Sequence, residues 1–199
     1  MNEDFNVKNA HCSYCGTRFT EQKLWPRKCF RCYNDSFSNP LPVVVVMQVV
    51  HRSLHSTEKD KNAYGIVIQQ RGIEPKKGQW ALTGGYIDAG ESWQEAAVRE
   101  VREELGLDIK EFHKLELYDV LSSANKDTML ICCIDKCPYD EKGYDWYSGF
   151  DEIIKHKGVV PNNEVQAVDI MWEERELAFP THTEWANRYL KELNQKKVK

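Results

Sequence analysis

The 199-residue sequence lacks any run of 18 or more apolar residues, which is the length that a membrane-spanning helix needs. It also lacks the apolar core of a secretory signal peptide. Its longest aliphatic run, residues 43–47, is too short to cross a bilayer and is typical of a buried strand. We therefore expect a cytoplasmic protein with no membrane partner.

The sequence also lacks a strong excess of one charge. It has 27 Lys and Arg residues against 31 Asp and Glu residues, which gives a formal net charge of −4. The chain as a whole therefore offers no electrostatic argument for a nucleic-acid partner. Hydrophobic residues make up 41% and charged residues 29%, which is typical of a globular protein rather than a disordered one.

The cysteines number seven and come without a secretion signal, which argues against a disulfide framework. Four of them form two Cys-x2-Cys pairs, namely Cys12, Cys15, Cys29 and Cys32. Two such pairs are typical of a closed, tetrahedral Zn²⁺ site, which stabilises a module too small to build its own core. We predict one structural zinc ion here, with two transient disulfides as the alternative.

The composition changes near residue 43. Residues 1–42 have few aliphatic side chains and end in a proline-containing linker, so we assign them to the zinc module. Residues 43–199 mix strand and helix patterns and predict one α/β domain. An aromatic, acidic insert spans about residues 138–160. We expect strands at 43–50, 64–70, 80–83, 115–122, 128–135 and 165–172, and helices at 92–105 and 184–196.

The helix at 92–105 carries an unusual crowd of carboxylates. Ser92 and Glu95 fit a capping box at its start, and Gly106 fits the left-handed residue after its end. Three glutamates fall within about 60° of one another around the helix axis, beside an apolar stripe. Hard cations such as Mg²⁺ prefer several oxygen ligands, although an acidic solvent-exposed face remains the simpler alternative. These glutamates are Glu100, Glu103 and Glu104.

The residues around this helix carry a family resemblance. They read Gly85-x5-Glu91-x7-Arg99-Glu100-Val101-x-Glu103-Glu104-x-Gly106-Leu107. Every fixed position of the Nudix box, G-x5-E-x7-R-E-U-x-E-E-x-G-U with U aliphatic, is filled, so the sequence resembles the Nudix hydrolases. The resemblance implies an α/β/α sandwich with a mixed sheet. It also implies hydrolysis of a nucleoside diphosphate linked to another moiety, with two or more Mg²⁺ or Mn²⁺ ions.

The resemblance also implies residue roles. The metal ligands would be Glu100, Glu103 and Glu104, with a backbone carbonyl of Gly84. The residues that orient the box would be Gly85, Glu91, Arg99 and Gly106. Glu103 and Glu104 are thus candidate catalytic residues, together with Glu164 outside the box. Glu164 would act as a ligand or general base, with an ordinary charge at a strand edge as the alternative, and Asp119 and Glu116 are weaker candidates.

A zinc ribbon before a Nudix domain resembles a group of ADP-ribose and FAD pyrophosphatases and, less closely, NADH pyrophosphatases. Residues 71–85 and 177–181 look like the first group, and the S-Q-P-W-x-F-P-x-S motif of the NADH enzymes is absent. We therefore expect a small-molecule substrate such as ADP-ribose or FAD. Candidate substrate contacts are Arg71, Trp80, Tyr118 and Phe179, although each ring is also typical of ordinary packing.

Two other readings of function remain open. Residues 1–42 carry six Lys and Arg residues against four Asp and Glu residues, with aromatics interleaved, so the ribbon could bind nucleotide-capped RNA. The domain could also be a non-catalytic nucleotide sensor, although it keeps all the box glutamates. The family resemblance allows a homodimer, but no residue identifies its interface.

Overall fold

The computed structural model describes residues 8–20, 24–51, 64–106, 109, 115–124, 126–135 and 163–195. The chain divides into two compact units, Met1–Pro40 and Leu41–Lys199. The predicted linker at residues 39–42 spans this division. The predicted insert at 138–160 lies outside the described residues, as does the last box position, Leu107.

The smaller unit is built from two similar turns. The N–H of Gly16 donates to the carbonyl of Cys12 at 3.0 Å, and the N–H of Tyr33 donates to the carbonyl of Cys29 at 2.9 Å. Gly16 and Tyr33 both have positive φ, which tightens each chain reversal. Strands β1 (Arg27–Lys28) and β2 (Asp35–Ser36) pair antiparallel on either side of the second turn.

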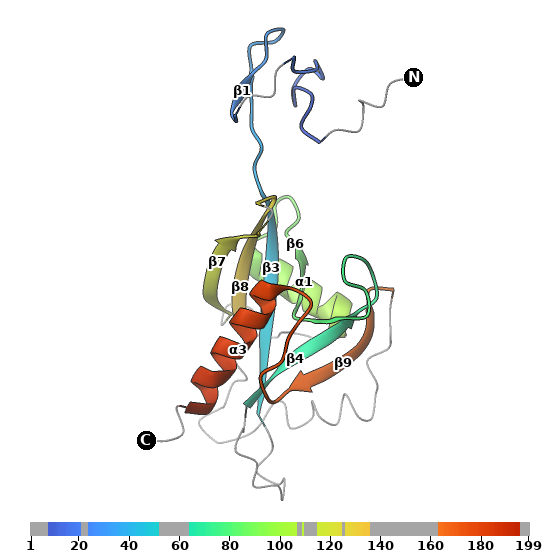
Figure 1. Ribbon diagram of the computed structural model, residues 1–199, viewed down its shortest axis with the longest axis vertical. Coiled ribbons are helices and arrows are strands. Elements are labelled where there is room, and N and C mark those ends of the chain that lie inside the picture. Colours follow the sequence, from blue (N-terminus) through green and yellow to red (C-terminus); the bar gives the residue numbers. More distant parts are fainter. Residues whose placement is uncertain are drawn as a thin grey trace, which may run out of the picture. The chain divides into compact units, whose positions relative to one another are not determined.

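The larger unit is a mixed sheet covered by two helices (Figure 1). The strand order is β5-β4-β3-β8-β7, with β6 also paired to β3 and β9 to β4. The β3–β8 pair is parallel, and the other pairs are antiparallel. The strands are β3 (Leu41–His51), β4 (Tyr64–Arg71), β5 (Trp80–Ala81), β6 (Thr83–Tyr86), β7 (Glu116–Ser122), β8 (Thr128–Asp135) and β9 (Val165–Met171).

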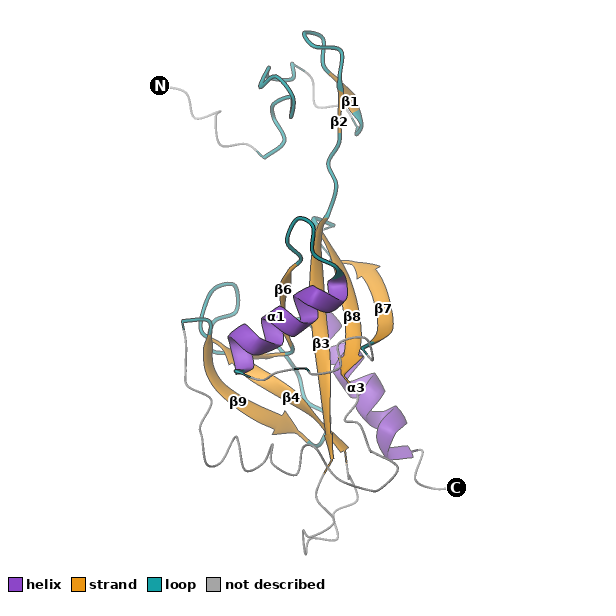
Figure 2. Ribbon diagram, turned by 180° about the vertical axis from the view of Figure 1, so that it is seen from behind, coloured by secondary structure: helices purple, strands orange, loops and turns teal. Residues whose placement is uncertain are grey.

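Helices α1 (Trp93–Leu105) and α3 (Pro180–Gln195) cover opposite faces of this sheet (Figure 2). Strand β3 is buried on both faces, which explains its continuous apolar run. Val45 and Met47 pack with Trp185 of α3, while Val44 and Val46 pack with residues of α1. The predicted α/β/α sandwich with a mixed sheet is confirmed.

Two predicted elements needed correction. The strand predicted at 80–83 is two strands, because Trp80 pairs with β4 whereas Thr83 pairs with β3. The closing helix was predicted from residue 184 but begins at Pro180. Proline suits the first position of a helix because it has no N–H that would need an intrahelical partner. No helix of the described residues is long and apolar enough to cross a membrane.

Candidate active site

Local capping fixes both ends of α1. Ser92 Oγ accepts from the N–H of Glu95 at 3.2 Å, and the N–H of Ser92 donates to Glu95 Oε2 at 2.8 Å. This is the predicted capping box. At the other end, Gly106 is left-handed with φ 68° and its N–H bonds the carbonyl of Arg102. The caps therefore determine where the helix begins and ends, and hence which turn presents the box glutamates.

The three box glutamates lie in different environments on α1. Glu100 and Glu104 are buried, with 8% and 6% of their surface exposed. The side chain of Glu103 is 60% exposed. The predicted apolar stripe of Ala97, Val101 and Leu105 is buried against the sheet. Burial of the stripe thus draws two of the three carboxylates into the interior and leaves the third at the surface.

Two glycines of β6 let the backbone approach these carboxylates. The N–H of Gly84 donates to Glu104 Oε2 at 3.0 Å. Gly84 has φ 151°, and a Cβ there would overlap the carbonyl oxygen of Val44. A Cβ on Gly85 would overlap the carboxylate of Glu100. Gly84 is therefore required by its close approach to β3, whereas a side chain at position 85 would displace the Glu100 carboxylate.

Arg99 of α1 connects this helix to the loop that leads from β6 to α1, residues 86–91. Its Nε lies 2.9 Å from Glu91 Oε1, and its Nη1 lies 2.7 Å from Glu100 Oε1 and 3.2 Å from Glu103 Oε2. Its Nη2 donates to the carbonyl of Tyr86 at 2.8 Å. Arg99 holds the pKa of the Glu91 carboxyl below its usual value. The guanidinium is thus fixed by both the loop and the helix.

The buried carboxylates resist ionisation. Burial raises the pKa of Glu104 to about 7, although the Gly84 N–H and the Gln69 side chain oppose this shift. Burial also raises the pKa of Glu100, although hydrogen bonding from Arg99 opposes this shift. The negative charge of Glu164 contributes to both increases, so it acts on the same site. Crowded carboxylates of this kind are stabilised by a cation.

Glu164 and the two weaker base candidates occupy different parts of the sheet. Glu164 directly precedes β9, is exposed, and its carbonyl accepts from the N–H of Gly72 at 2.6 Å. Asp119 and Glu116 lie on β7, at the edge farthest from β5 in the strand order. Asp119 is bound to Trp185 Nε1 at 2.9 Å and to Arg188 Nη2 at 3.1 Å. The structure therefore brings Glu164 into electrostatic contact with the box, whereas Asp119 is bound to two side chains of α3.

The donor set fits a hard divalent cation. Carboxylate oxygens are the ligands that Mg²⁺ and Mn²⁺ prefer. Two of the carboxylates are buried with raised pKa values, and a third is exposed on the same helix. Glu100, Glu103, Glu104 and Glu164 are therefore candidate ligands for such an ion.

Comparison with known proteins identifies the family of this chain. The family model described as NUDIX domain matches residues 47–193. The nucleoside triphosphatase NudI of Enterobacter sp. (strain 638) is 38% identical over 113 residues, which cover 55% of this chain and 70% of that protein. The chain belongs to the NUDIX family. The predicted Nudix hydrolase class is thereby confirmed, and Nudix hydrolases use divalent metal ions.

Two further similarities extend the comparison. The ADP-ribose pyrophosphatase of Methanocaldococcus jannaschii is 41% identical over 70 residues, covering 35% of this chain and 38% of that protein. The crystal structure of a NUDIX hydrolase from Nitrosomonas europaea aligns with a TM-score of 0.58 and 21% identity. That alignment covers 93% of this chain and 92% of the other, and it supports the fold.

Three of the four predicted substrate contacts in this Nudix domain lie together. The guanidinium of Arg71 lies over the ring of Phe179, 5.2 Å from its centroid. The N–H of Ala178 donates to the carbonyl of Trp80 at 2.6 Å, which places Trp80 beside the same segment. Tyr118 lies apart from these residues on β7, where Arg188 Nε donates to its hydroxyl at 2.7 Å. The structure thus separates Tyr118 from the other candidates.

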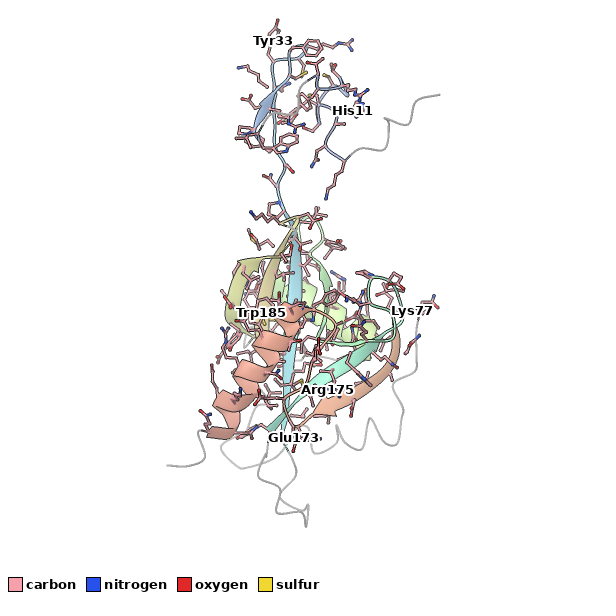
Figure 3. All side chains as sticks on the ribbon, in the orientation of Figure 1. His11, Tyr33, Lys77, Glu173, Arg175 and Trp185 are labelled. Carbon is pink, nitrogen blue, oxygen red and sulfur yellow. The ribbon has the colours of Figure 1, made fainter. Side chains whose placement is uncertain are left out.

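Two residues that the sequence did not single out belong to this region of the Nudix domain. Arg175, labelled in Figure 3, lies over the ring of Trp80 at 5.3 Å from the centroid. Gln69 is buried in β4, and its side chain opposes the rise in the pKa of Glu104 that burial causes. Gln69 follows the apolar residues 66–68, and a polar residue inside a buried strand was a usable signal. No comparable local signal marked Arg175.

The four cysteines of the smaller unit form one cluster. Their Sγ atoms all lie within 4.8 Å of one another, with 3.6 Å between Cys12 and Cys32 and 3.6 Å between Cys15 and Cys29. A tetrahedral ion with Zn–S bonds of about 2.3 Å places its sulfurs about 3.8 Å apart. The six described cysteines are free thiols, and Cys132 and Cys133 are buried in β8 as predicted. The cluster could therefore hold a metal ion.

Proposed function

We propose that the protein is a Mg²⁺- or Mn²⁺-dependent pyrophosphatase that acts on a nucleoside diphosphate linked to another moiety, with ADP-ribose or FAD as the substrate class. The observation that carries this proposal is the pair of buried carboxylates, Glu100 and Glu104. Each is oriented by a different partner, Arg99 for Glu100 and the N–H of Gly84 for Glu104. Burying two carboxylates costs folding free energy unless their charge is compensated, so their burial is better explained by ion binding than by stability.

The proposed roles follow from exposure and contacts. Glu100 and Glu104, with the exposed Glu103, would hold the ions. A bound divalent ion neutralises phosphate oxygens and lowers the pKa of a bound water. Glu164 would accept the proton of the attacking water, or would act as a further ligand. Addition of water to one phosphorus breaks the P–O–P bond, so two monophosphates leave.

The substrate class rests on the segment around Trp80 and Phe179. The guanidinium of Arg71 lies over the ring of Phe179, and that of Arg175 lies over the ring of Trp80. Each aromatic ring of this segment is therefore paired with a cation. Aromatic rings stack on nucleobases, and guanidinium groups pair with phosphates. The similarity to a protein named as an ADP-ribose pyrophosphatase supports the same class. The similarity to a protein named as a nucleoside triphosphatase makes triphosphates the necessary comparison.

A substrate panel tests this proposal. Purified protein is incubated in Mg²⁺ or Mn²⁺ with ADP-ribose, FAD, NADH, diadenosine polyphosphates, UDP-glucose and the nucleoside triphosphates, with Glu103→Gln as the blank. We expect ADP-ribose or FAD to be split fastest, into two monophosphates. A preference for triphosphates with release of pyrophosphate would overturn the substrate class. Equal product from the blank would overturn the site.

We also propose that the four-cysteine cluster holds one structural Zn²⁺ ion. The Sγ separations agree with a tetrahedral thiolate site. Four protein ligands leave no open position for chemistry, which favours a structural role. Among the described residues of this unit, the buried hydrophobic side chains are the cluster cysteines Cys12 and Cys29, so a metal would supply much of its stability.

A second candidate function is supported by exposed rings next to the cluster. Three aromatic residues, each next to a cluster cysteine in the sequence, are largely exposed: Tyr14 at 64%, Phe30 at 62% and Tyr33 at 73%. Exposed rings with the exposed Arg31 are suited to stacking single-stranded bases. Fluorescence anisotropy with a capped oligonucleotide tests this. Binding that weakens steeply with salt and with Phe30→Ala supports an RNA-directed enzyme, and absence of binding at low salt contradicts it.

A further inference from the structure

The main chain of Glu164 is held by a close contact at the end of β4. Gly72, the residue after β4, is buried, and its N–H donates to the carbonyl of Glu164 at 2.6 Å. A Cβ on Gly72 would lie 2.6 Å from the carbonyl oxygen of Asn163 and 2.9 Å from the carbonyl carbon of Glu164. These are main-chain atoms, so any side chain at position 72 would push residues 163–164 away.

The backbone conformation of Gly72 does not explain why glycine stands there. Its φ is not positive, unlike those of Gly78 and Gly84, so its own backbone could carry a side chain. The feature that a side chain would disturb is the contact with the main chain of residues 163–164. Glycine at position 72 is therefore explained by the close approach of two distant chain segments.

A bulge in β9 directly precedes this contact in the β4–β9 ladder. Gln70 pairs with Ala167 and Arg71 pairs with Val165, so Gln166 is an extra residue in β9. Bulges change the direction of the side chains that follow them and are common beside active sites. Val165 is 0% exposed, whereas the residue before it, Glu164, is exposed. The bulge and the hydrogen bond from residue 72 therefore determine together where the main chain of Glu164 lies.

The donor of this hydrogen bond belongs to a closed loop, residues 71–79. The N–H of Arg71 donates to the carbonyl of Gln79 at 2.9 Å, and the N–H of Gly78 donates to the carbonyl of Arg71 at 2.8 Å. Within the loop, Nε of Arg71 donates to the carbonyl of Pro75 at 2.8 Å. The loop thus constrains the position from which residue 72 presents its N–H.

This loop and the start of β9 lie beside the end of α1 that carries the box glutamates. Figures 1 and 2, which view the molecule from opposite sides, both show the last turns of α1 next to the start of β9 and to the loop after β4. Ile170 of β9 belongs to the same apolar cluster as Val101 of α1. The last turns of α1 include Glu103 and Glu104. A displacement of the Glu164 main chain would therefore move its carboxylate relative to these glutamates.

We propose that Gly72 is a positioning residue that holds the main chain of Glu164 beside the carboxylates of α1, both through its N–H and through the absence of a side chain. This role rests on the proposed function, in which Glu164 is the general base or a further metal ligand. A displacement of about 1 Å at a reacting group can cost about 10²-fold in rate. Gly72 therefore affects hydrolysis through the main chain of Glu164 rather than through a side chain of its own.

The chain contains a matched control, Gly65. This residue lies in β4, is buried, and also lacks a positive φ. A Cβ there would lie 2.6 Å from Ile170 Cγ2 and 2.8 Å from Trp172 Cε3. Residues 65–72 span about 23 Å of extended chain, so the two glycines lie at opposite ends of β4. A Gly→Ala change at either position crowds β4 against the segment of β9, but only the change at position 72 displaces Glu164.

The experiment compares the full-length wild type, Gly72→Ala, Gly65→Ala, Glu164→Gln and the double variant Gly72→Ala/Glu164→Gln. We measure kcat and the half-saturating Mg²⁺ concentration with ADP-ribose, or with the fastest substrate of the panel, and Tm by thermal unfolding. Gly72→Ala is expected to change the same kinetic parameter as Glu164→Gln, by about 10- to 100-fold. The double variant is expected to be no slower than Glu164→Gln, because the position of a carboxylate has no effect once the carboxylate is removed. Gly65→Ala is expected to lower Tm and to keep both kinetic parameters within about twofold of the wild type.

The outcomes separate this role from the proposed function. Losses that multiply in the double variant, or an equal kinetic loss in Gly65→Ala, would show a general structural effect and overturn the role of Gly72. Wild-type kinetics of Gly72→Ala or of Glu164→Gln would also overturn it and leave the hydrolase proposal standing. A wild type that hydrolyses no member of the panel would overturn the proposed function itself.

A second variant covers the case in which Gly72→Ala does not fold. Glu164→Asp keeps the carboxylate and the main-chain contact but draws the charge back by one methylene. We expect at least a tenfold change in the parameter that Glu164→Gln alters. Wild-type kinetics of Glu164→Asp would show that the position of this carboxylate does not matter, and would overturn the role of Gly72.

Discussion

The backbone N–H of Leu82 donates a hydrogen bond to Nδ1 of His182, 3.2 Å away, and this contact joins the β5–β6 segment to α3. His182 is buried beside Phe179, with 5.0 Å between the ring centroids. Nδ1 can accept this hydrogen bond only while it carries no proton. The contact therefore requires the neutral imidazole.

The first prediction is a loss of stability in mild acid that depends on His182. Burial lowers the pKa of His182 from 6.5 to about 3 in the folded protein. Because the unfolded chain binds the proton below pH 6.5 and the folded chain does not, this contribution to stability is complete above pH 6.5 and is lost as the pH falls toward 3. We expect the loss to reach about 2 kcal/mol at pH 5.

Urea unfolding of the wild type and of His182→Asn at pH 7.5 and pH 5 measures this effect. Asparagine keeps an acceptor but does not titrate, so the variant is expected to lose less stability between the two pH values. The comparison isolates His182 from the other titrating groups. Equal losses in both proteins would show that the buried imidazole is not the cause.

The second prediction concerns the box glutamates. Glu103→Gln and Glu104→Gln remove a carboxylate charge with little change of shape, so we expect turnover to fall by several orders of magnitude while the fold survives. Glu95→Gln is the control on the same helix, because Glu95 belongs to the capping box. It is expected to cost at most about 1 kcal/mol of stability and to keep near-normal turnover. Near-normal turnover of either box variant would contradict the ligand assignment.

The third prediction is that Gly85→Ala inactivates through Glu100. A Cβ at Gly85 would overlap the Glu100 carboxylate and force it to move. We expect at least a tenfold loss of kcat/KM. Gly78→Ala is the control, because no atom lies within 4 Å of the Cβ position of Gly78, whose own φ is positive at 81°. Its cost is limited to about 1–2 kcal/mol of backbone strain, measured by thermal unfolding.

The fourth prediction separates the two roles of Glu164. Glu164→Gln is expected to lower kcat by about 10²- to 10⁴-fold with an unchanged half-saturating Mg²⁺ concentration if Glu164 is the base. A rise in that concentration with recovery at high Mg²⁺ would identify a ligand instead. Turnover and metal requirement equal to those of the wild type would show that Glu164 is an ordinary charge at the strand edge.

The fifth prediction concerns the cysteine cluster. Elemental analysis of the purified protein is expected to find one zinc per chain, and Cys15→Ser is expected to lose it and to destabilise residues 8–40. Cys133→Ser is the comparison, since Cys133 is buried in β8 and outside the cluster. That variant is expected to keep its zinc. Intact protein without zinc would refute the assignment.

Local signals explain why much of the fold was predictable. The caps of α1 depend on residues within a few positions of each other, and Ser92, Glu95 and Gly106 lie where the sequence placed them. The spacing of the box glutamates likewise depends only on helix geometry. Strand β3 was identified because four consecutive valines suit a strand that is buried on both faces.

Features that depend on pairing between distant segments were not predictable. The break between β5 and β6 at Leu82 arises because the chain passes from pairing with β4 to pairing with β3. The separation of Tyr118 from Trp80 follows from a strand order that the sequence does not encode locally. The effect of Gln69 on the pKa of Glu104 links a strand to a helix 35 positions later, so composition and spacing could not reveal it.

The parallel pairing of β3 with β8 has a consequence for synthesis of the chain. Gln48 and Asp135, which end this ladder, are 87 positions apart, whereas the antiparallel partners β4 and β6 follow β3 more closely. At 5–20 residues per second, the ribosome needs roughly 4 to 17 seconds to deliver the missing neighbour. During that interval one edge of the valine-rich strand is open to pairing with another nascent chain. This edge of β3 is therefore exposed to mispairing until β8 has been synthesised.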